Sequence, residues 1–257
     1  MATFRFEIEN NTVLSFEGIH SEDFDGKLVI PEGVAAIGAS AFQGSRKVLS
    51  LQIPGTVREI GENAFECCDR LEYALLQEGV TTLGFGAFMG CDHLHTLHLP
   101  AGITCMEEYA LSGCSALTAV TIPTGLDRLA PHLLSNCYGL KALLIPGNIR
   151  KIEEDALGDC SGLESVVLSE GITAIDREAF TGCEALTEVT LPKSLTYLGE
   201  RAFAGCSALN KITVQNPDTF LDDGVFENCG ENLTICAPAG SHAQAYAQAN
   251  GIPFTAI

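Results

Sequence analysis

The sequence predicts an α/β repeat protein: a solenoid of stacked copies, each with a short strand and with short helical or 3-10 turns elsewhere. Three observations predict it. A pattern returns every 23 residues without insertion, each copy holds a short extended segment, and a cysteine recurs at one place in the copies. A fixed period of this length is typical of stacked repeat architectures. The nine copies begin at Leu28, Leu51, Ala74, Leu97, Val120, Leu143, Val166, Val189 and Ile212.

Each copy follows the pattern L-x-I-P-x-G-V-x-x-I-G-x-x-A-F-x-G-C-x-x-L-x-x, which we number as positions 1 to 23. Positions 1 and 3 are apolar and alternate with an outward position 2, which predicts a strand. Proline at position 4 lacks an N–H group, so the strand ends there. V-x-x-I predicts a second, shorter extended piece, and A-F predicts a single helical or 3-10 turn.

Position 17 holds residues that tolerate a left-handed backbone, and a cysteine follows at position 18. Position 17 is glycine, asparagine or aspartate in every copy except the second, where it is Cys67. We therefore expect a positive φ at this position, with mild strain at Cys67. The column of cysteines comprises Cys68, Cys91, Cys114, Cys137, Cys160, Cys183, Cys206 and Cys229, and Ser45 takes its place in the first copy.

The cysteine column has three interpretations. Stacked copies place equivalent residues about 4.8 Å apart, and parallel Cβ vectors at that spacing disfavour disulfides. We expect free, buried thiols that fill a narrow corner of the coil. Disulfides and a metal remain alternatives, although no C-x-x-C pair is present. Cys105 lies at position 9, outside the column, and is expected to be partly exposed.

The unit resembles the BspA-like leucine-rich repeats of bacterial surface and gut proteins over about residues 28–232, and the tail APAGSHAQAYAQANGIPF resembles the end of such proteins. The resemblance implies a right-handed leucine-rich-repeat solenoid with its parallel sheet on the concave side. It also implies adhesion or protein binding without catalysis. Export is common among such proteins.

The repeat boundaries suggest one domain with closed ends. Residues 1–27 are predicted to form an N-terminal cap, because alternating segments on both sides of Asn10-Asn11 favour a hairpin. Residues 28–232 form the nine repeats, and residues 233–257 form a C-terminal cap. Within that cap, Ser241 is expected to begin a short helix that ends at Asn250-Gly251.

Charge and hydropathy limit the classes of partner. The net charge of −19 argues against nucleic acid and anionic membranes, because both are polyanions. No window approaches 18 consecutive apolar residues, so no membrane insertion is expected. The N-terminus shows no signal peptide, which predicts a cytoplasmic protein if the chain is full length. A cell-surface or secreted location is the alternative if a leader was removed.

Two groups of residues could hold a metal ion. The stretch His93–His98 contains three histidines, which leaves open a metal-dependent or enzymatic module as the alternative function. Acidic residues collect near positions 11 to 13, but no D-x-D-x-D-G calcium loop occurs. We expect surface histidines and a solvated acidic edge, with no cofactor and no catalytic residue.

The best candidate for a binding site is the outward face of the strands. Side chains at positions 23 and 2 do not pack inside the coil, yet several are apolar or aromatic. The hypothesis is that a protein or peptide binds across this concave face. The alternative is that strand propensity alone favours such residues. The candidate residues are Tyr73, Leu75, His98, Leu144 and Val167.

Overall fold

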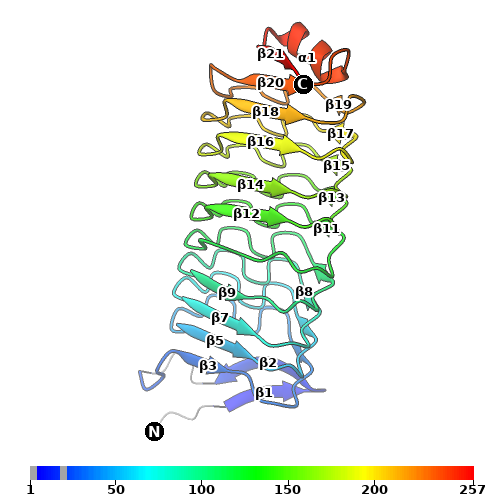
Figure 1. Cartoon of the computed structure of the whole chain (residues 1–257). Coiled ribbons are helices and arrows are strands. Elements are labelled where there is room, and N and C mark those ends of the chain that lie inside the picture. The colour runs from blue at the N-terminus through cyan, green and yellow to red at the C-terminus, as the bar shows by residue number, and fades with distance from the viewer. Residues whose placement is uncertain (1–4, 18–21) are drawn as a thin grey trace. The chain divides into compact units, whose positions relative to one another are not determined.

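The computed structural model describes residues 5–17 and 22–257, so residues 1–4 and 18–21 of the predicted N-terminal cap lie outside the described residues. The chain groups into two compact units, Met1–Leu126 and Asp127–Ile257. Each is a right-handed solenoid of parallel strands, as the resemblance to leucine-rich repeats implies. The labelled strands of each unit follow one another coil by coil in Figure 1.

The first unit contains two sheets. The long strands at positions 23 to 3 form one sheet, and two-residue strands at positions 9 and 10 form the other, extended by a hairpin. The long-strand sheet contains β3 (Lys27–Val29), β5 (Ser50–Ile53), β7 (Tyr73–Leu76) and β9 (Thr96–His98). The short-strand sheet contains β1 (Arg5–Glu9), β2 (Thr12–Glu17), β4 (Ala36–Ile37), β6 (Glu59–Ile60), β8 (Thr82–Leu83) and β10 (Cys105–Met106).

The second unit has the same two kinds of strand, but its long strands form two hydrogen-bonded sheets, one of two strands and one of four. Its long strands are β12 (Ala142–Ile145), β14 (Ser165–Leu168), β16 (Glu188–Leu191), β18 (Lys211–Val214) and β20 (Thr234–Ala237), followed by β21 (Phe254–Ala256). Its short strands are β11 (Arg128–Leu129), β13 (Lys151–Ile152), β15 (Ala174–Ile175), β17 (Tyr197–Leu198) and β19 (Phe220–Leu221). The V-x-x-I segment therefore forms the second extended piece that the pattern predicts.

Register confirms that like residues stack. Leu28 is paired with Leu51, and Leu143 with Val166, each exactly one 23-residue step apart. Inward strand positions are buried and outward positions are exposed, as in β12, where the residues alternate. Side chains alternate across a pleated strand, so a repeated sequence in register builds continuous columns on each face.

The two ends of the repeat array carry different elements. At the N-terminal end β1 and β2 form an antiparallel hairpin, with positive φ at Asn10 and Asn11 in its turn. At the C-terminal end the helix α1 (His242–Asn250) begins at Ser241, whose hydroxyl accepts a bond from Gln244 N, and it ends at Gly251 with φ of 67°. A serine N-cap and a left-handed glycine are common helix boundaries.

The third side of each coil consists of hydrogen-bonded turns. In the first copy, Gln43 N donates to Ser40 O and Ser45 N to Phe42 O, which are the three-residue bonds of 3-10 turns. The intervening N–H groups donate to the next coil, as Phe42 N does to Ala64 O at 2.8 Å. This alternation satisfies buried backbone groups within and between coils.

Two columns of positive φ shape these turns. The predicted column at position 17 is confirmed, from Gly44 at 66° to Asn228 at 57°, and Cys67 shares it at 53°. A second column at position 13 was not predicted, because its residues include types that rarely adopt this conformation. It contains Ser40, Asn63, Gly86, Tyr109, His132, Asp155, Glu178, Arg201 and Gly224.

The core of each unit is a set of stacked columns. Rings at position 15 lie parallel, with centroids 5.1 Å apart for Phe42 and Phe65 and 5.0 Å apart for Phe180 and Phe203. Leucine, isoleucine and alanine columns surround them and are almost fully buried. In the described residues, no helix is long and apolar enough to cross a membrane.

Candidate interaction surface

The five candidate residues lie on the outward face of the long-strand sheets, in two separate groups. Tyr73 and Leu75 on β7 and His98 on β9 belong to the first unit. Leu144 on β12 and Val167 on β14 belong to the second unit. We name these groups the first-unit patch and the second-unit patch.

In the first-unit patch, an aromatic pair lies across neighbouring strands. Leu75 is the register partner of His98. The rings of Tyr73 and His98 meet edge to face, with centroids 5.6 Å apart. Tyr73 and His98 are exposed and Leu75 is half-buried, while Val29, on β3 of the same face, is also exposed. This patch combines aromatic rings with polar atoms, which suits a partner surface that has both apolar and polar groups.

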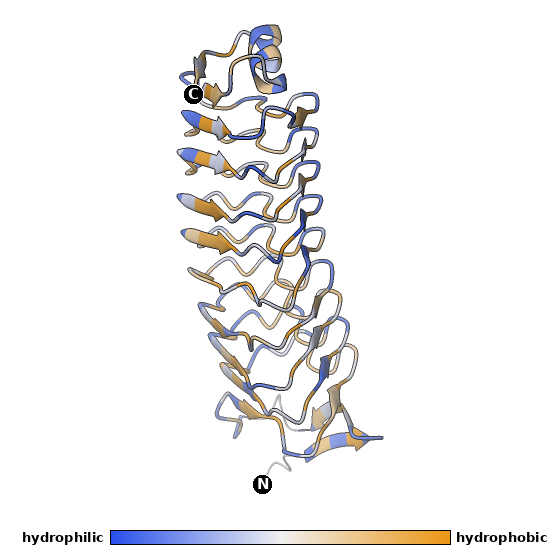
Figure 2. Cartoon of the chain, turned by 45° about the vertical axis from the view of Figure 1, so that its right-hand side comes forward, coloured by the Kyte–Doolittle hydropathy of each residue, from blue (hydrophilic) through white to orange (hydrophobic). Residues whose placement is uncertain are grey.

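In the second-unit patch, two aliphatic side chains lie side by side. Leu144 is the register partner of Val167, and each is 58% exposed. Figure 2 shows β12 and β14 hydrophobic along most of their length, whereas β16 and β18 mix hydrophobic and polar residues. The inward neighbours Leu143 and Val166 fill the core, so the outward pair has no role in core packing.

The histidine stretch does not form a metal site. His93, His95 and His98 are all exposed, and His95 Nδ1 lies 3.0 Å from the Thr96 hydroxyl. Among the described residues, no group of three or more His, Cys, Asp or Glu side chains is placed to hold a metal ion. The alternative function that the sequence left open therefore gains no geometric support from this region.

Part of the acidic edge of the second unit is neutralised within the protein. Lys151 Nζ lies 2.7 Å from Asp176, and Arg128 lies 3.3 Å from Glu153. These pairs follow the short-strand face from coil to coil. They explain acidic residues near positions 11 to 13 as partners of basic side chains one coil away.

Seven of the eight cysteines in the column are buried and Cys229 is half-buried, and none of the eight forms a disulfide with another described residue. Seven of these thiols donate to the carbonyl at position 15 of the preceding copy: Cys68, Cys91, Cys114, Cys160, Cys183, Cys206 and Cys229. Cys68 Sγ donates to Phe42 O at 3.2 Å, and Cys206 Sγ donates to Phe180 O at 3.2 Å. Cysteine therefore supplies both a compact apolar body and a weak donor.

Burial makes these thiols poor nucleophiles. It raises the pKa of Cys68, Cys114 and Cys160 to about 12, and each thiol therefore stays protonated at neutral pH. Cys105 on β10 is half-buried, as expected from its mixed column. Cys67 is exposed, and partial burial together with nearby carboxylates raises the pKa of its thiol.

The short-strand face of the second unit carries an aromatic pair, one ring half-buried and one exposed, that the sequence analysis did not select. Tyr197 and Phe220 are register partners with parallel rings 6.2 Å apart. Phe220 is 53% exposed, and the Tyr197 hydroxyl donates to Asp222 at 3.0 Å. Two successive aromatic residues at position 9 were the signal that could have identified this pair.

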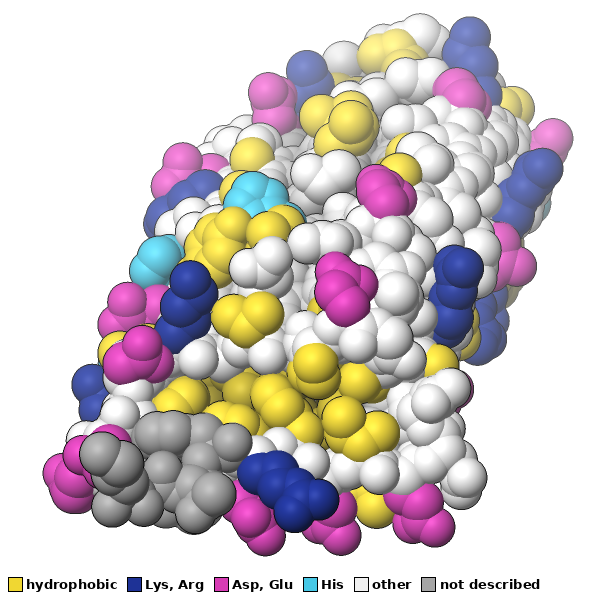
Figure 3. Space-filling model, turned by 90° about the horizontal axis from the view of Figure 1, so that it is seen from below, with side chains coloured by type: hydrophobic (Ala, Val, Ile, Leu, Met, Phe, Trp, Pro, Cys, Tyr) yellow, Lys and Arg dark blue, Asp and Glu magenta, His cyan; other side chains and the backbone are white. Residues whose placement is uncertain are grey.

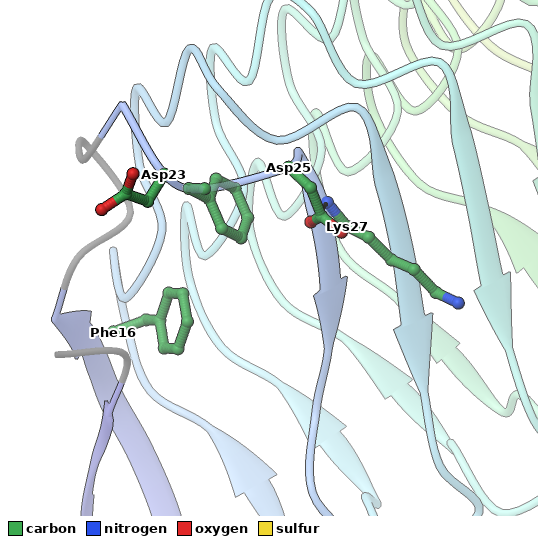
Figure 4. A pocket seen from close by; sticks show the side chains of 5 residues that line it. Phe16, Asp23, Asp25 and Lys27 are labelled. Atoms are coloured by element: carbon green, nitrogen blue, oxygen red, sulfur yellow. Dashed lines mark hydrogen bonds between the residues drawn. The ribbon is translucent and has the colours of Figure 1, made fainter. Parts of the chain in front are cut away.

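A small hollow lies beside the N-terminal hairpin. It has a volume of about 310 Å³ and is lined by Phe16, Asp23, Phe24, Asp25 and Lys27 (Figure 4). The rings of Phe16 and Phe24 lie 5.8 Å apart, edge to face. Its lining shows no convergent set of nucleophile, base and oxyanion donors of the kind that a catalytic site requires.

Parallel coils of 23 residues, a thiol column and outward apolar patches define a leucine-rich repeat solenoid. A model of the BspA type leucine rich repeat region matches residues 25–141 and 131–241. The chain belongs to this family. No protein with a curated description matches it significantly.

Solved structures agree with this fold. A leucine-rich repeat protein from Bacteroides ovatus is 27% identical, with a TM-score of 0.68, over 92% of this chain and 69% of that one. The T. pallidum leucine rich repeat protein is 20% identical, with a TM-score of 0.64, over 71% of this chain and 87% of that one. The second likeness supports the fold alone.

Proposed function

We propose that the protein is a non-catalytic scaffold that binds a protein or peptide through the outward face of its long-strand sheets. The observation that carries the proposal is the second-unit patch, where Leu144 and Val167 expose adjacent aliphatic surface on the two-stranded sheet of β12 and β14. Membership of a repeat family that generally serves in protein interaction supports it. The net charge of −19 makes a nucleic acid an unsuitable partner.

Apolar area explains why this patch suits a protein partner. Burying a half-exposed leucine or valine on association contributes on the order of 1 kcal/mol per side chain. The surrounding outward residues are small or polar, such as Ala142 and Ser165, which leaves the patch open to approach. A small apolar centre with a polar rim is the usual organisation of a protein interface.

The competing explanation for these exposed aliphatic residues is that they merely favour the strand conformation. A matched substitution distinguishes this explanation from a binding role. Position 2 is threonine in two neighbouring copies, Thr190 and Thr213. The double change Leu144→Thr and Val167→Thr therefore keeps residues that are well suited to a strand while it removes aliphatic surface. We expect unchanged stability and loss of the bound partner.

The experiment is quantitative capture from extracts of the native host with folded wild-type protein and variants side by side. Proteins captured by the wild type should be lost with the double threonine variant. They should be retained with Tyr138→Thr, which removes an exposed ring outside the long strands. Equal capture by all three proteins would show that the second-unit patch is not the binding surface.

We also propose that the protein works at the cell surface or outside the cell, as the resemblance to exported repeat proteins implies. The structure is compatible with an oxidising environment, because burial keeps the thiols of Cys68, Cys114 and Cys160 protonated by raising the pKa of each to about 12. Antibody labelling of intact and lysed host cells tests this proposal. Labelling of lysed cells only would contradict it.

A further inference from the structure

The free edge of β1 is the starting point. β1 is the outermost strand of the short-strand sheet in the first unit, where it pairs with β2. An edge strand offers a row of N–H and C=O groups to another chain. Within residues 5–17 and 22–257, no second strand pairs with β1 on its other side.

The sequence of β1 is complementary to itself. It reads Arg-Phe-Glu-Ile-Glu from Arg5 to Glu9. When two copies run antiparallel about Glu7, Arg5 lies opposite Glu9 of the second copy, and this pair occurs twice. Phe6 lies opposite Ile8 of the second copy, also twice. Opposite charges and apolar residues in facing positions stabilise antiparallel pairing.

The charged groups needed for this pairing are available. Arg5, Glu7 and Glu9 are exposed, and neither Arg5 nor Glu9 makes an ion pair with any described residue. At the twofold axis, Glu7 of one copy would lie opposite Glu7 of the other copy. Its carboxylate already accepts a bond from the Ser15 hydroxyl at 2.8 Å. Its diagonal neighbours are Arg5 and Glu9 of the second copy, and Arg5 offsets part of the repulsion.

Apolar surface surrounds the same edge. Ile8 is 46% exposed and Leu14 is 38% exposed, while Phe6 packs against Phe16 with ring centroids 4.6 Å apart. Figure 3, which views the chain from below, shows hydrophobic side chains gathered on the visible face. An exposed apolar group beside an unpaired edge is a common feature of association sites.

We propose that two copies of the protein associate through their β1 strands, which pair antiparallel about Glu7 and form a twofold dimer. Such an interface is isologous, since each contact occurs twice by symmetry. The pairing is weak and reversible, because a five-residue strand buries less area than a stable dimer interface requires. This dimer leaves the second-unit patch as a separate surface.

A charge exchange tests the register. Arg5→Glu places two acidic residues opposite each other twice, and we expect the dimer dissociation constant in sedimentation velocity to rise at least tenfold. Arg5→Glu combined with Glu9→Arg restores both pairs and should restore the dimer. Arg70→Glu makes the same change of charge at an exposed position outside β1 and should leave association unchanged.

Two outcomes would overturn the proposal. One is a wild-type protein that stays monomeric at millimolar concentration. The other is a dimer that Arg5→Glu leaves intact, or that the double exchange does not restore. Circular dichroism and thermal unfolding of every variant establish that the hairpin and the coils remain folded.

A disulfide at the twofold axis provides a second measurement. The background variant carries Cys67→Ser, Cys105→Ser and Cys229→Ser, which removes the exposed and half-buried thiols of the described residues. In the proposed register, Glu7→Cys places two cysteines with Cα atoms about 4.5–5.5 Å apart, within disulfide range. Mild oxidation should give a covalent dimer, while Glu17→Cys on β2 should not. Equal cross-linking of both variants, or none with Glu7→Cys, would contradict the register.

Discussion

The thiol column yields a prediction whose magnitude follows from the geometry. Cys183 is fully buried, and its Sγ donates to Leu157 O at 3.4 Å. Cys183→Ala removes one buried heavy atom, worth about 0.8 kcal/mol in transfer, and leaves a cavity of roughly 20 Å³, worth about 0.5 kcal/mol. The lost weak hydrogen bond adds about 0.5 kcal/mol. We expect a total cost of about 2 kcal/mol.

The serine variant isolates the hydrogen bond. Leu157 O also accepts from Cys160 N, so Cys183→Ala does not leave that carbonyl unpaired. Cys183→Ser retains a donor to the same oxygen, and Ser45 is already buried at the equivalent position of the first copy. We therefore expect Cys183→Ser to cost about 1 kcal/mol, less than the alanine variant.

Urea unfolding followed by circular dichroism measures both free energies, and thermal unfolding should show a loss of about 5 °C for the alanine variant. Cys67→Ala, at an exposed thiol, is the control and should change stability by less than about 0.5 kcal/mol. A cost below about 0.5 kcal/mol for Cys183→Ala, or a serine variant less stable than the alanine variant, would refute the reasoning.

Three further predictions concern single side chains. Iodoacetamide at pH 8 should modify Cys67 and spare Cys68 in the folded protein, because burial raises the pKa of Cys68 to about 12; mass spectrometry after digestion reads the sites. Cys67→Gly should raise the free energy of unfolding, measured in urea, by about 0.5–1 kcal/mol, because glycine adopts the φ of 53° at this position without strain. Cys67→Ala should give no such gain. Burial raises the pKa of Asp155 despite its 2.7 Å contact with His132, so Asp155→Asn should raise Tm at pH 7. The folded pKa lies above the unfolded one, so this advantage should disappear as the pH falls below about 3.9.

The period and the inward columns could be predicted because stacking makes each coil reuse the same environment. The strands ending near proline, the buried thiols and the left-handed position 17 all follow from residue types repeated at one place. Position 13 escaped prediction because Tyr109, Arg201 and Glu178 adopt positive φ under tertiary constraint. Their residue types favour no such conformation, so only the coil geometry reveals it.

The outward surface was predictable in position but not in role. Alternation identifies which residues of a strand point outward, and Leu144 and Val167 are indeed exposed. Alternation cannot rank one exposed column above another, and the Tyr197 and Phe220 pair on the short-strand face was therefore missed. To decide which exposed column binds a partner, one must know which side chains lie next to each other on adjacent strands. The pattern within a single copy does not contain that information.

The division of each copy into inward and outward positions explains how this fold can vary its partner without losing its core. Inward positions satisfy stacking, backbone bonds and the thiol column in every coil, so substitutions there act on stability. Outward positions 23, 2 and 9 have few such contacts, and their residue types differ from coil to coil. Because the cores are almost identical, any selectivity must come from these outward columns and from the ends of the array. A solenoid of this kind can therefore gain an interaction site by changing two side chains on adjacent strands, at little cost to its stability.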